Sequence, residues 1–258
     1  MSRRLEGLSA LITGASRGIG FAIAREFVEQ GARVFLVARD QARLEQAAAQ
    51  LGDSAVVGTY ACDVGDAIAL EEMFRAAEEW AGDLDVLVNN AGIHLGKPFT
   101  DYRLDEFDRV MNINVRSVFR LMQLAIVHMR QLQGGKIVNV SSTAGRFESA
   151  NQAVYNASKH ALNGLTLCAA LENAPYGINI NAICPGMVNT DMWDSFVKEA
   201  ATRGVNGDML RKGVEARIPI GRFIEPEEVA HIAVWLASHE ADGMAGQLIT
   251  ISGGMRMG

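Results

Sequence analysis

The sequence predicts an α/β fold of the doubly wound type, in which one parallel sheet of seven strands is covered by helices on both faces. Short apolar runs alternate along the chain with longer segments whose apolar residues recur at helical spacing. Near-continuous apolar strands are typical of parallel sheets, because such strands are buried on both faces. No low-complexity segment or internal repeat interrupts the alternation, so we expect a single domain over residues 1–258.

The elements can be placed in order along the chain. The expected strands cover residues 8–12, 32–38, 55–64, 84–92, 135–142, 177–186 and 246–254. The expected helices cover residues 21–32, 41–51, 67–81, 104–132 and 154–174. Residues 190–225 contain helical patches but no strand. A long excursion of this kind at the carboxyl end of a strand is either a substrate lid or a loosely packed insertion, and we favour the lid.

Composition and charge exclude several classes of protein. The net charge of −6 over 258 residues gives no reason to expect nucleic acid as a partner. There is no apolar run of about 18 residues, so we expect no membrane span, and with no signal peptide we expect a cytoplasmic protein. The three cysteines, Cys62, Cys168 and Cys184, form no C-x-x-C pair and are interpreted as reduced thiols. We expect no metal site.

A glycine-rich stretch, TGASRGIG, follows the first predicted strand and precedes the first predicted helix. Its glycines are Gly14, Gly18 and Gly20, and Arg17 stands among them. The first N–H groups of a helix lack internal partners and carry partial positive charge, and glycine lets a phosphate approach them closely. The turn is therefore a candidate pyrophosphate site, although a purely structural glycine turn remains an alternative at this point.

A second stretch carries acid–base chemistry. Tyr155 and Lys159 are four residues apart, so they share one face of a helix, and Ser142 lies at the end of a predicted strand. A tyrosine hydroxyl ordinarily titrates near pH 10, and a neighbouring ammonium would lower its pKa. The serine hydroxyl could hold a carbonyl oxygen while the tyrosine transfers the proton. An ordinary amphipathic helix is the alternative when Tyr-x-x-x-Lys is considered alone.

The motifs gain specificity from their order. Along the chain stand Gly14-x-x-x-Gly18-x-Gly20, Asn89-Asn90-Ala91-Gly92, Asn114, Ser142, Tyr155-x-x-x-Lys159 and Pro185-Gly186. In this combination, from Gly7 to Gly254, the sequence resembles the short-chain dehydrogenase/reductase family in its compact single-domain form, which has a Rossmann-type fold. Within the family it is similar to the 3-oxoacyl-carrier-protein reductases and the polyketide ketoreductases.

The resemblance implies roles for particular residues. Tyr155 would be the acid–base residue, Ser142 (rather than Ser141) would orient the substrate oxygen, and Lys159 would hold the nicotinamide ribose and tune the tyrosine. Asn114, rather than its neighbour Asn112, would belong to the proton relay. The cofactor would be bound by Tyr155, Lys159 and by Gly14, Ser16, Arg17, Gly18, Ile19, Gly20, Arg39, Asp63, Val64, Asn90, Ala91, Gly92, Ile183, Pro185, Gly186, Val188 and Thr190.

The cofactor is expected to be NADPH rather than NADH. An NAD-preferring site usually has an acidic residue at the end of the second strand, which bonds the ribose 2′-hydroxyl. Ala38 stands there, followed by Arg39, which could pair with a 2′-phosphate, and Arg17 could add a second positive charge. Asp40 is expected to cap the next helix instead.

The expected reaction is hydride transfer from NADPH to a ketone or a 3-oxoacyl carbonyl. A carrier protein or CoA ester would require basic residues near the entrance, for which Arg116, Arg120, Arg130 and Lys136 are candidates. The segment ALENAPYG lacks an arginine that carrier-protein reductases commonly have, so a small free ketone, diketone, sugar or cyclic alcohol is the alternative substrate. A catalytically silent cofactor-sensing protein is a more remote alternative. Lid residues Met192, Trp193, Phe196 and Met209 indicate a partly apolar pocket.

Two helices are more widely apolar than a sheet-covering helix requires. The helix over residues 104–132 carries Val118, Phe119, Leu121 and Val127, and the helix after Tyr155 is similar. The apolar side chains that do not face the sheet need another surface to cover them. Family resemblance implies that these helices pair across one two-fold axis, and that the last strand with the tail GGMRMG pairs across another. We therefore expect a homotetramer with 222 symmetry.

Overall fold

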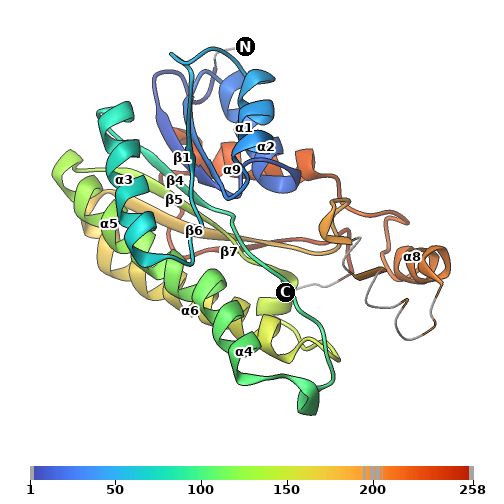
Figure 1. The fold of residues 1–258 in the computed structure, drawn as a ribbon. Coiled ribbons are helices and arrows are strands. Elements are labelled where there is room, and N and C mark those ends of the chain that lie inside the picture. Colours follow the sequence, from blue (N-terminus) through green and yellow to red (C-terminus); the bar gives the residue numbers. More distant parts are fainter. Residues whose placement is uncertain (1–2, 194–195, 198–200, 202–203, 205, 256–258) are drawn as a thin grey trace.

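The computed structural model describes residues 3–193, 196–197, 201, 204 and 206–255, and its centre is one seven-stranded parallel sheet (Figure 1). The strand order is β3-β2-β1-β4-β5-β6-β7. The strands are β1 (Ser9–Thr13), β2 (Arg33–Ala38), β3 (Val57–Ala61), β4 (Val86–Asn89), β5 (Gly135–Val140), β6 (Ile178–Pro185) and β7 (Leu248–Ile251). The predicted number and parallel arrangement of strands are confirmed.

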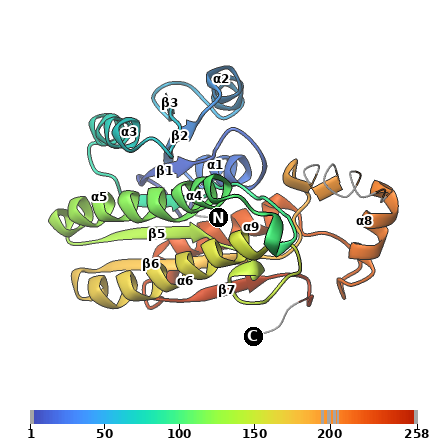
Figure 2. The same cartoon turned by 60° about the horizontal axis from the view of Figure 1, so that its bottom comes forward.

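Helices cover both faces of the sheet, as Figures 1 and 2 show. One face is covered by α1 (Gly18–Glu29), α2 (Gln41–Ala49) and α9 (Pro226–Ala237). The other is covered by α3 (Ala67–Ala81), α5 (Ser117–Leu132) and α6 (Ala153–Asn173). Two further helices, α4 (Leu104–Met111) and α8 (Gly207–Glu215), lie beyond the strands' carboxyl ends, together with short 3-10 turns at Phe99–Asp101 and Thr143–Gly145. Two more 3-10 turns, Ala174–Tyr176 and His239–Ala241, lie at the amino ends of β6 and β7.

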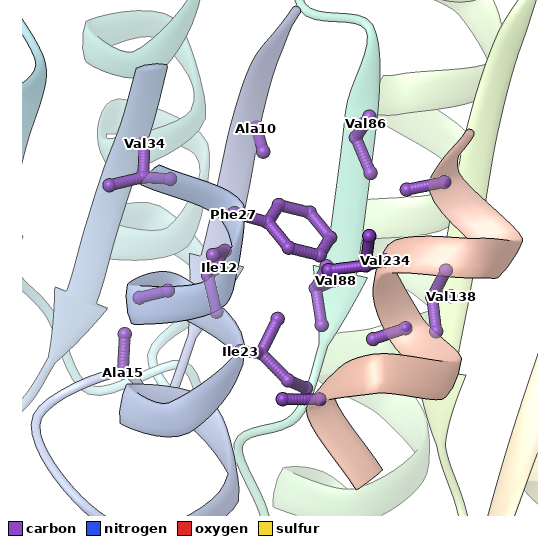
Figure 3. Close-up of a cluster of buried hydrophobic side chains, with 14 of the residues drawn as sticks. Ala10, Ile12, Ala15, Ile23, Phe27, Val34, Val86, Val88, Val138 and Val234 are labelled. Carbon is purple, nitrogen blue, oxygen red and sulfur yellow. The ribbon is translucent and has the colours of Figure 1, made fainter. Parts of the chain in front are cut away.

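Each face of the sheet has its own apolar core. On the α1 and α9 face, the fully buried ring of Phe27 lies between the two helices and the side chains of β1 and β4 (Figure 3). Ile23 from α1 and Val234 from α9 pack around it. Burial of these side chains on a rigid sheet fixes where α1 begins, and so positions the glycine turn that precedes it.

The strand order reverses direction between β1 and β4. From β1 the chain moves outward through β2 and β3, then returns to the other side of β1 to form β4. The loops that follow β1 and β4 therefore diverge, and a crevice opens between them at the carboxyl ends of the strands. This crevice is the expected place for a ligand in an open parallel sheet.

The helix expected over residues 104–132 is interrupted. Between α4 and α5 the chain forms one π-helical turn, Asn112–Arg116, in which the backbone takes an extra residue. The Ser117 hydroxyl donates to the carbonyl of Ile113 at 2.6 Å, and the side chain of Asn114 bonds outside the helix. The predicted bounds of the long helix are confirmed, but its π turn was not predicted, because helical periodicity in a sequence does not distinguish a π turn from an α turn.

The excursion after β6 is partly described. Val188 forms an isolated parallel bridge with Ile224, and α8 lies between them in the chain. The buried residues Trp193, Ile218 and Phe223 form a small apolar cluster there, with the Trp193 and Phe223 rings 4.8 Å apart. Within the described ranges of this excursion no strand forms, as predicted.

The described parts of the chain contain no helix that is both long enough and apolar enough to cross a membrane.

Candidate active site

The glycine turn after β1 is built on a tight approach to β4. Gly14 and Gly18 have φ of +66° and +56°, a backbone region that favours glycine. A Cβ on Gly20 would lie 2.3 Å from the carbonyl oxygen of Gly14, so no other residue fits there without a shift. The three glycines are required by the turn's own geometry, in addition to any ligand.

The amino end of α1 differs from those of its neighbours α2 and α3. Its N-cap residue, Arg17, makes no side-chain capping bond. By contrast, the carboxylate of Asp40 caps α2 and that of Asp66 caps α3. The first N–H groups of α1 thus receive no side-chain oxygen from their N-cap, and such groups at a helix amino terminus favour an anion.

Asn90 holds the turn in place. Its Nδ2 donates to the carbonyls of Thr13 at 2.9 Å and of Gly14 at 3.1 Å. The Thr13 hydroxyl oxygen in turn accepts the N–H groups of Asn90 and Ala91 at 3.0 and 3.1 Å. These bonds join the ends of β1 and β4. The side-chain amide of Asn90 is engaged in this support, and a contact with an adenine ribose stays a prediction.

The end of β2 carries the expected cation. β2 ends at Ala38, and the guanidinium of Arg39 lies 3.9 Å from the carboxylate of Asp63, with both side chains about half exposed. Asp40 accepts the N–H of Arg43 at 3.1 Å, so the prediction that it caps the next helix is confirmed. Asp63 also accepts the N–H of Gly65 at 2.9 Å, and Val64 beside it is buried.

The loop after β6 returns to the glycine turn. The guanidinium of Arg17 pairs with the carboxylate of Asp191 at 3.1 Å, and a Cβ on Gly18 would lie 3.4 Å from the Thr190 methyl. Of the remaining predicted cofactor residues, Ser16 and Ile19 lie in the glycine turn, Ala91 and Gly92 follow β4, and Ile183, Pro185, Gly186 and Val188 lie in or just after β6. The predicted residues outside α6 therefore come from five separate segments, all at the carboxyl ends of the strands.

Ser142, Tyr155 and Lys159 meet at the carboxyl end of β5. Ser142 follows the strand and its side chain hydrogen-bonds the Tyr155 hydroxyl. Its Oγ also accepts the N–H of Ala144 at 3.1 Å, which fixes its position. Lys159 is buried, its Nζ donates to the carbonyl of Val140 at 2.9 Å, and that nitrogen lies 5.8 Å from the Tyr155 ring centre. The tyrosine and lysine share one face of α6, as predicted.

The pKa values differ from the expectation. Burial raises the pKa of Tyr155 above its ordinary value, and the hydrogen bond from Ser142 opposes this only in part. Burial also lowers the pKa of Lys159, from 10.5 to about 8. The expected lowering of the tyrosine pKa by the lysine is therefore wrong. Desolvation disfavours the charged form of both groups, and the ammonium is directed at a backbone carbonyl.

Asn114 is buried within the π turn, and both polar atoms of its side chain are hydrogen-bonded. Its Oδ1 accepts the N–H of Ile93, and its Nδ2 donates to the carbonyl of Ile93 and to the Ser158 hydroxyl, at 2.9, 2.9 and 3.1 Å. Asn112 instead donates to the carbonyl of Gly65 at 2.8 Å, away from this group. The side chain of Asn114 thus fixes the loop after β4, so any part in proton transfer would use its backbone.

The sequence analysis missed one residue of the site. The ring of His94 lies edge-on to that of Tyr155, with 5.0 Å between centres, and packs on Phe196 at 4.1 Å. Its Nε2 is buried without a hydrogen-bond partner among the described residues, and burial lowers its pKa to about 4. A signal was available: a histidine four residues after Asn90 belongs to a loop at the carboxyl end of a strand.

The expected basic patch at the entrance does not form from the predicted residues. Lys136 lies at the start of β5, where it bonds Asn179 and Asp242. This is the amino end of the strand, and the site lies at the carboxyl end. Arg130 bonds Asn173 at the far end of α5. Arg120 pairs with Glu71 of α3 at 2.7 Å. Arg130 and Lys136 lie at the amino ends of the strands, whereas the site lies at the carboxyl ends. The four predicted residues, which include Arg116, therefore do not form one surface.

The depressed pKa of Lys159 has a consequence for stability. Between pH 8 and 10.5 an unfolded lysine still binds its proton while the buried one has lost it, so the unfolded state binds more protons and stability rises with pH. From pH 8 to pH 10 we expect the free energy of unfolding of the ligand-free wild type to rise by about 2 kcal/mol more than that of Lys159→Met. Urea denaturation of both proteins at the two pH values measures this. A constant difference between them would contradict the buried-lysine account.

Comparison with known proteins agrees with this geometry. Residues 14–256 match a family model described as enoyl-(acyl carrier protein) reductase, a model of the short-chain dehydrogenases/reductases. The chain is 36% identical over 253 residues to D-beta-hydroxybutyrate dehydrogenase of Cupriavidus necator, covering 97% of this chain and 98% of that protein. It is also 36% identical over 253 residues to a 3-oxoacyl-[acyl-carrier-protein] reductase of Vibrio cholerae, covering 98% and 99%.

A solved structure is similar throughout. The crystal structure of a putative gluconate dehydrogenase from Agrobacterium tumefaciens superposes with a TM-score of 0.90 at 33% identity, covering 99% of this chain and 98% of that one. These relatives are oxidoreductases that act on CH–OH or C=O groups, and the family uses nicotinamide cofactors. The family model covers nearly the whole chain and the curated relatives exceed 30% identity over nearly their full length: this chain belongs to the short-chain dehydrogenase/reductase family.

Proposed function

We propose that this protein is an NADPH-dependent reductase that converts a ketone into a secondary alcohol. The observation that carries the proposal is the meeting of Ser142, Tyr155 and Lys159 at the end of β5, beside a crevice that begins at the glycine turn. Bound in this crevice, the reduced nicotinamide would supply the hydride.

The residues present are suited to such a cofactor. The amino end of α1 offers N–H groups that no N-cap side chain engages, which favours the diphosphate there. Gly14, Gly18 and Gly20 keep that end free of side chains. Lys159 would hold the ribose hydroxyls, and the segment from Pro185 to Thr190 would line the nicotinamide.

The chain's own groups would handle the proton. The Ser142 hydroxyl would hold the carbonyl oxygen, and Tyr155 would donate its Oη proton to that oxygen as it gains negative charge. Because burial keeps Tyr155 protonated at neutral pH, it is in the form that reduction requires. Asn114, through Ile93, would keep the loop beside the tyrosine in place.

Preference for NADPH follows from charge at the end of β2. Arg39 has no acidic residue before it in the strand, and Asp40 is engaged as a helix cap. A 2′-phosphate would accept charge-assisted hydrogen bonds from the Arg39 guanidinium. Arg17, in the glycine turn, would add a second cation, since its partner Asp191 is exposed and its ion pair is screened by solvent.

A free ketone suits the site better than a carrier-bound one. Of the basic residues expected to receive a carrier protein, Arg130 and Lys136 lie away from the site and Arg120 pairs with Glu71. The known relatives named above include both a hydroxybutyrate dehydrogenase and a carrier-protein reductase, so family membership alone leaves this open. We propose that residues 190–225 act as the substrate lid, because Phe196 packs on His94 beside Tyr155.

A homotetramer is proposed from uncovered apolar surface. Val118 and Leu121 of α5 face the sheet, whereas Phe119 and Val127 on the same helix are 46% and 62% exposed. Leu171 on α6 is 80% exposed. A shallow apolar pocket of about 210 Å³ lies between α4 and α6. Strand β7 has only β6 beside it and forms an edge that a second copy could cover, while tail residues 256–258 lie outside the described residues.

Replacing Tyr155 by Phe removes the transferable proton and keeps the ring. We expect turnover of ketones to fall about 10²–10⁴-fold, the usual contribution of a general acid, while NADPH still binds. The measurement is the loss of reduced-nicotinamide absorbance with a ketone panel, together with NADPH binding by fluorescence. Tyr176→Phe is the control, because it makes the same change just before the amino end of β6, away from the site. Activity of Tyr155→Phe within a few-fold of wild type would refute the role.

Replacing Arg39 or Ala38 by Asp should move preference from NADPH towards NADH. A charge-assisted contact of about 1.5–3 kcal/mol corresponds to a shift of about one to two decades in the ratio of kcat/KM values. Arg43→Asp, an equal change of charge in the first turn of α2, controls for net charge alone. If the wild type uses the two cofactors equally well, the assignment of Arg39 and Arg17 is wrong.

Light scattering behind a sizing column tests the assembly. We expect four times the chain mass of 27.8 kDa for the wild type. Leu171→Asp places a charge in the proposed α5–α6 interface and should yield a smaller species. Ile68→Asp, at a site on α3 that is 74% exposed, should leave the tetramer intact. A monomer mass for the wild type over the working concentration range would reject the assembly and leave the catalytic proposal unaffected.

A further inference from the structure

His94 is a buried polar group beside the reacting tyrosine that the chemistry described so far does not use. Its ring is held between Tyr155 and Phe196, with centres 5.0 and 4.1 Å away. Its Nε2 is buried and has no hydrogen-bond partner among the described residues. Buried polar atoms are nearly always paired in folded proteins, and one left unpaired costs free energy. An unpaired nitrogen at this position is therefore suited to a group that arrives with the substrate.

The backbone presents this ring rigidly. The residue before it, Ile93, has its N–H bonded to Asn114 Oδ1 and its carbonyl bonded to Asn114 Nδ2, both at 2.9 Å. Asn114 is itself buried and tied to Ser158 on α6, the helix that carries Tyr155. His94 and Tyr155 are thus fixed relative to each other by two short hydrogen-bonded links. Two polar groups held at a fixed distance select ligands whose own polar groups have the matching spacing.

The charge state of the ring restricts what it can bind. Burial lowers the pKa of His94 to about 4, so the imidazole is neutral at physiological pH. A neutral imidazole donates or accepts a hydrogen bond but offers no positive charge to a carboxylate. Nearby cations are also engaged: Lys159 bonds the Val140 carbonyl, and Arg146 bonds the Leu248 carbonyl and the Thr250 hydroxyl. An uncharged hydroxyl or carbonyl is therefore a matching partner for His94, since it needs a hydrogen bond and no opposite charge.

We propose that His94 is a specificity-determining residue, whose Nε2 hydrogen-bonds an uncharged hydroxyl one or two carbons from the carbonyl that Tyr155 protonates. The substrate class is then an α- or β-hydroxyketone, and the product is the corresponding diol. Phe196, which packs on the imidazole, would help to shield this hydrogen bond from water. The inference rests on the proposed ketone reduction and specifies its substrate.

The test compares three ketones of the same chain length. These are 2-butanone, 3-hydroxy-2-butanone and 4-hydroxy-2-butanone, each reduced with NADPH by the wild type, His94→Phe and His94→Gln. Phenylalanine keeps a planar ring against Phe196 and Tyr155 but cannot hydrogen-bond, whereas glutamine restores a donor and an acceptor. His239→Phe, at an exposed histidine far from the site, is the matched control. Comparing variants cancels the intrinsic difference in reactivity between the ketones.

The wild type should prefer at least one hydroxyketone over 2-butanone. In His94→Phe the ratio of kcat/KM for that hydroxyketone to kcat/KM for 2-butanone should fall about tenfold, with 2-butanone itself changed less than about threefold. His94→Gln should recover part of the ratio, and His239→Phe should leave it unchanged. A ratio that does not change in His94→Phe, or an equal loss for all three ketones, would overturn the proposal, since either result assigns His94 a purely structural part.

A binding measurement separates this inference from the proposed function. The enzyme–NADPH complex is titrated with 2,3-butanediol, 1,3-butanediol and 2-butanol, which do not react with the reduced cofactor, and tryptophan fluorescence reports binding. Binding of a diol about tenfold tighter than 2-butanol, lost in His94→Phe, supports the role of His94. Equal affinities overturn it. If the wild type reduces no ketone, the proposed function fails, and the titration still decides the assignment of His94.

Discussion

The hydrogen bonds from the Asn90 amide to the carbonyls of Thr13 and Gly14 tie together the two strand ends on which the site depends. β1 and β4 are neighbours in the sheet, but their following loops separate, which opens the crevice. Together with the bonds to the Thr13 hydroxyl oxygen, the Asn90 bonds fix the position of the glycine turn relative to the loop after β4. The close approach that Gly14 and Gly20 permit is what brings the Asn90 amide within reach of both carbonyls.

Burial of polar groups is the second feature that shapes the site. Tyr155, Lys159 and His94 are each shifted by desolvation towards the neutral form. At neutral pH the buried tyrosine and histidine are therefore uncharged, whereas Lys159 keeps most of its charge and is held by the Val140 carbonyl, and the exposed cations Arg17 and Arg39 lie by the glycine turn and the end of β2. In such surroundings a hydrogen bond discriminates between ligands more strongly than in water, because an unpaired partner cannot be solvated.

Two loops that are distant in sequence meet over the tyrosine. The loop after β4 supplies His94, and the excursion after β6 supplies Phe196. The same excursion reaches the glycine turn through Asp191 and Arg17, and packs on itself through Trp193 and Phe223. One segment therefore contacts both the residues beside Tyr155 and the glycine turn, which is consistent with the proposal that it acts as a lid.

The sequence by itself determined the seven strands, the glycine turn and the shared helix face of Tyr155 and Lys159, because each depends on local periodicity or on a spacing of a few residues. The cap made by Asp40 was equally local and was predicted correctly. Only the tertiary structure decided which side chains meet and how deeply they are buried. It revealed the π turn at Asn114, turned the Asn90 amide towards the glycine turn, and separated Arg130 and Lys136 from the entrance. It also raised the pKa of Tyr155 rather than lowering it, and placed His94 against that ring. These outcomes depend on strand register, helix direction and desolvation, which arise from contacts between residues far apart in the chain.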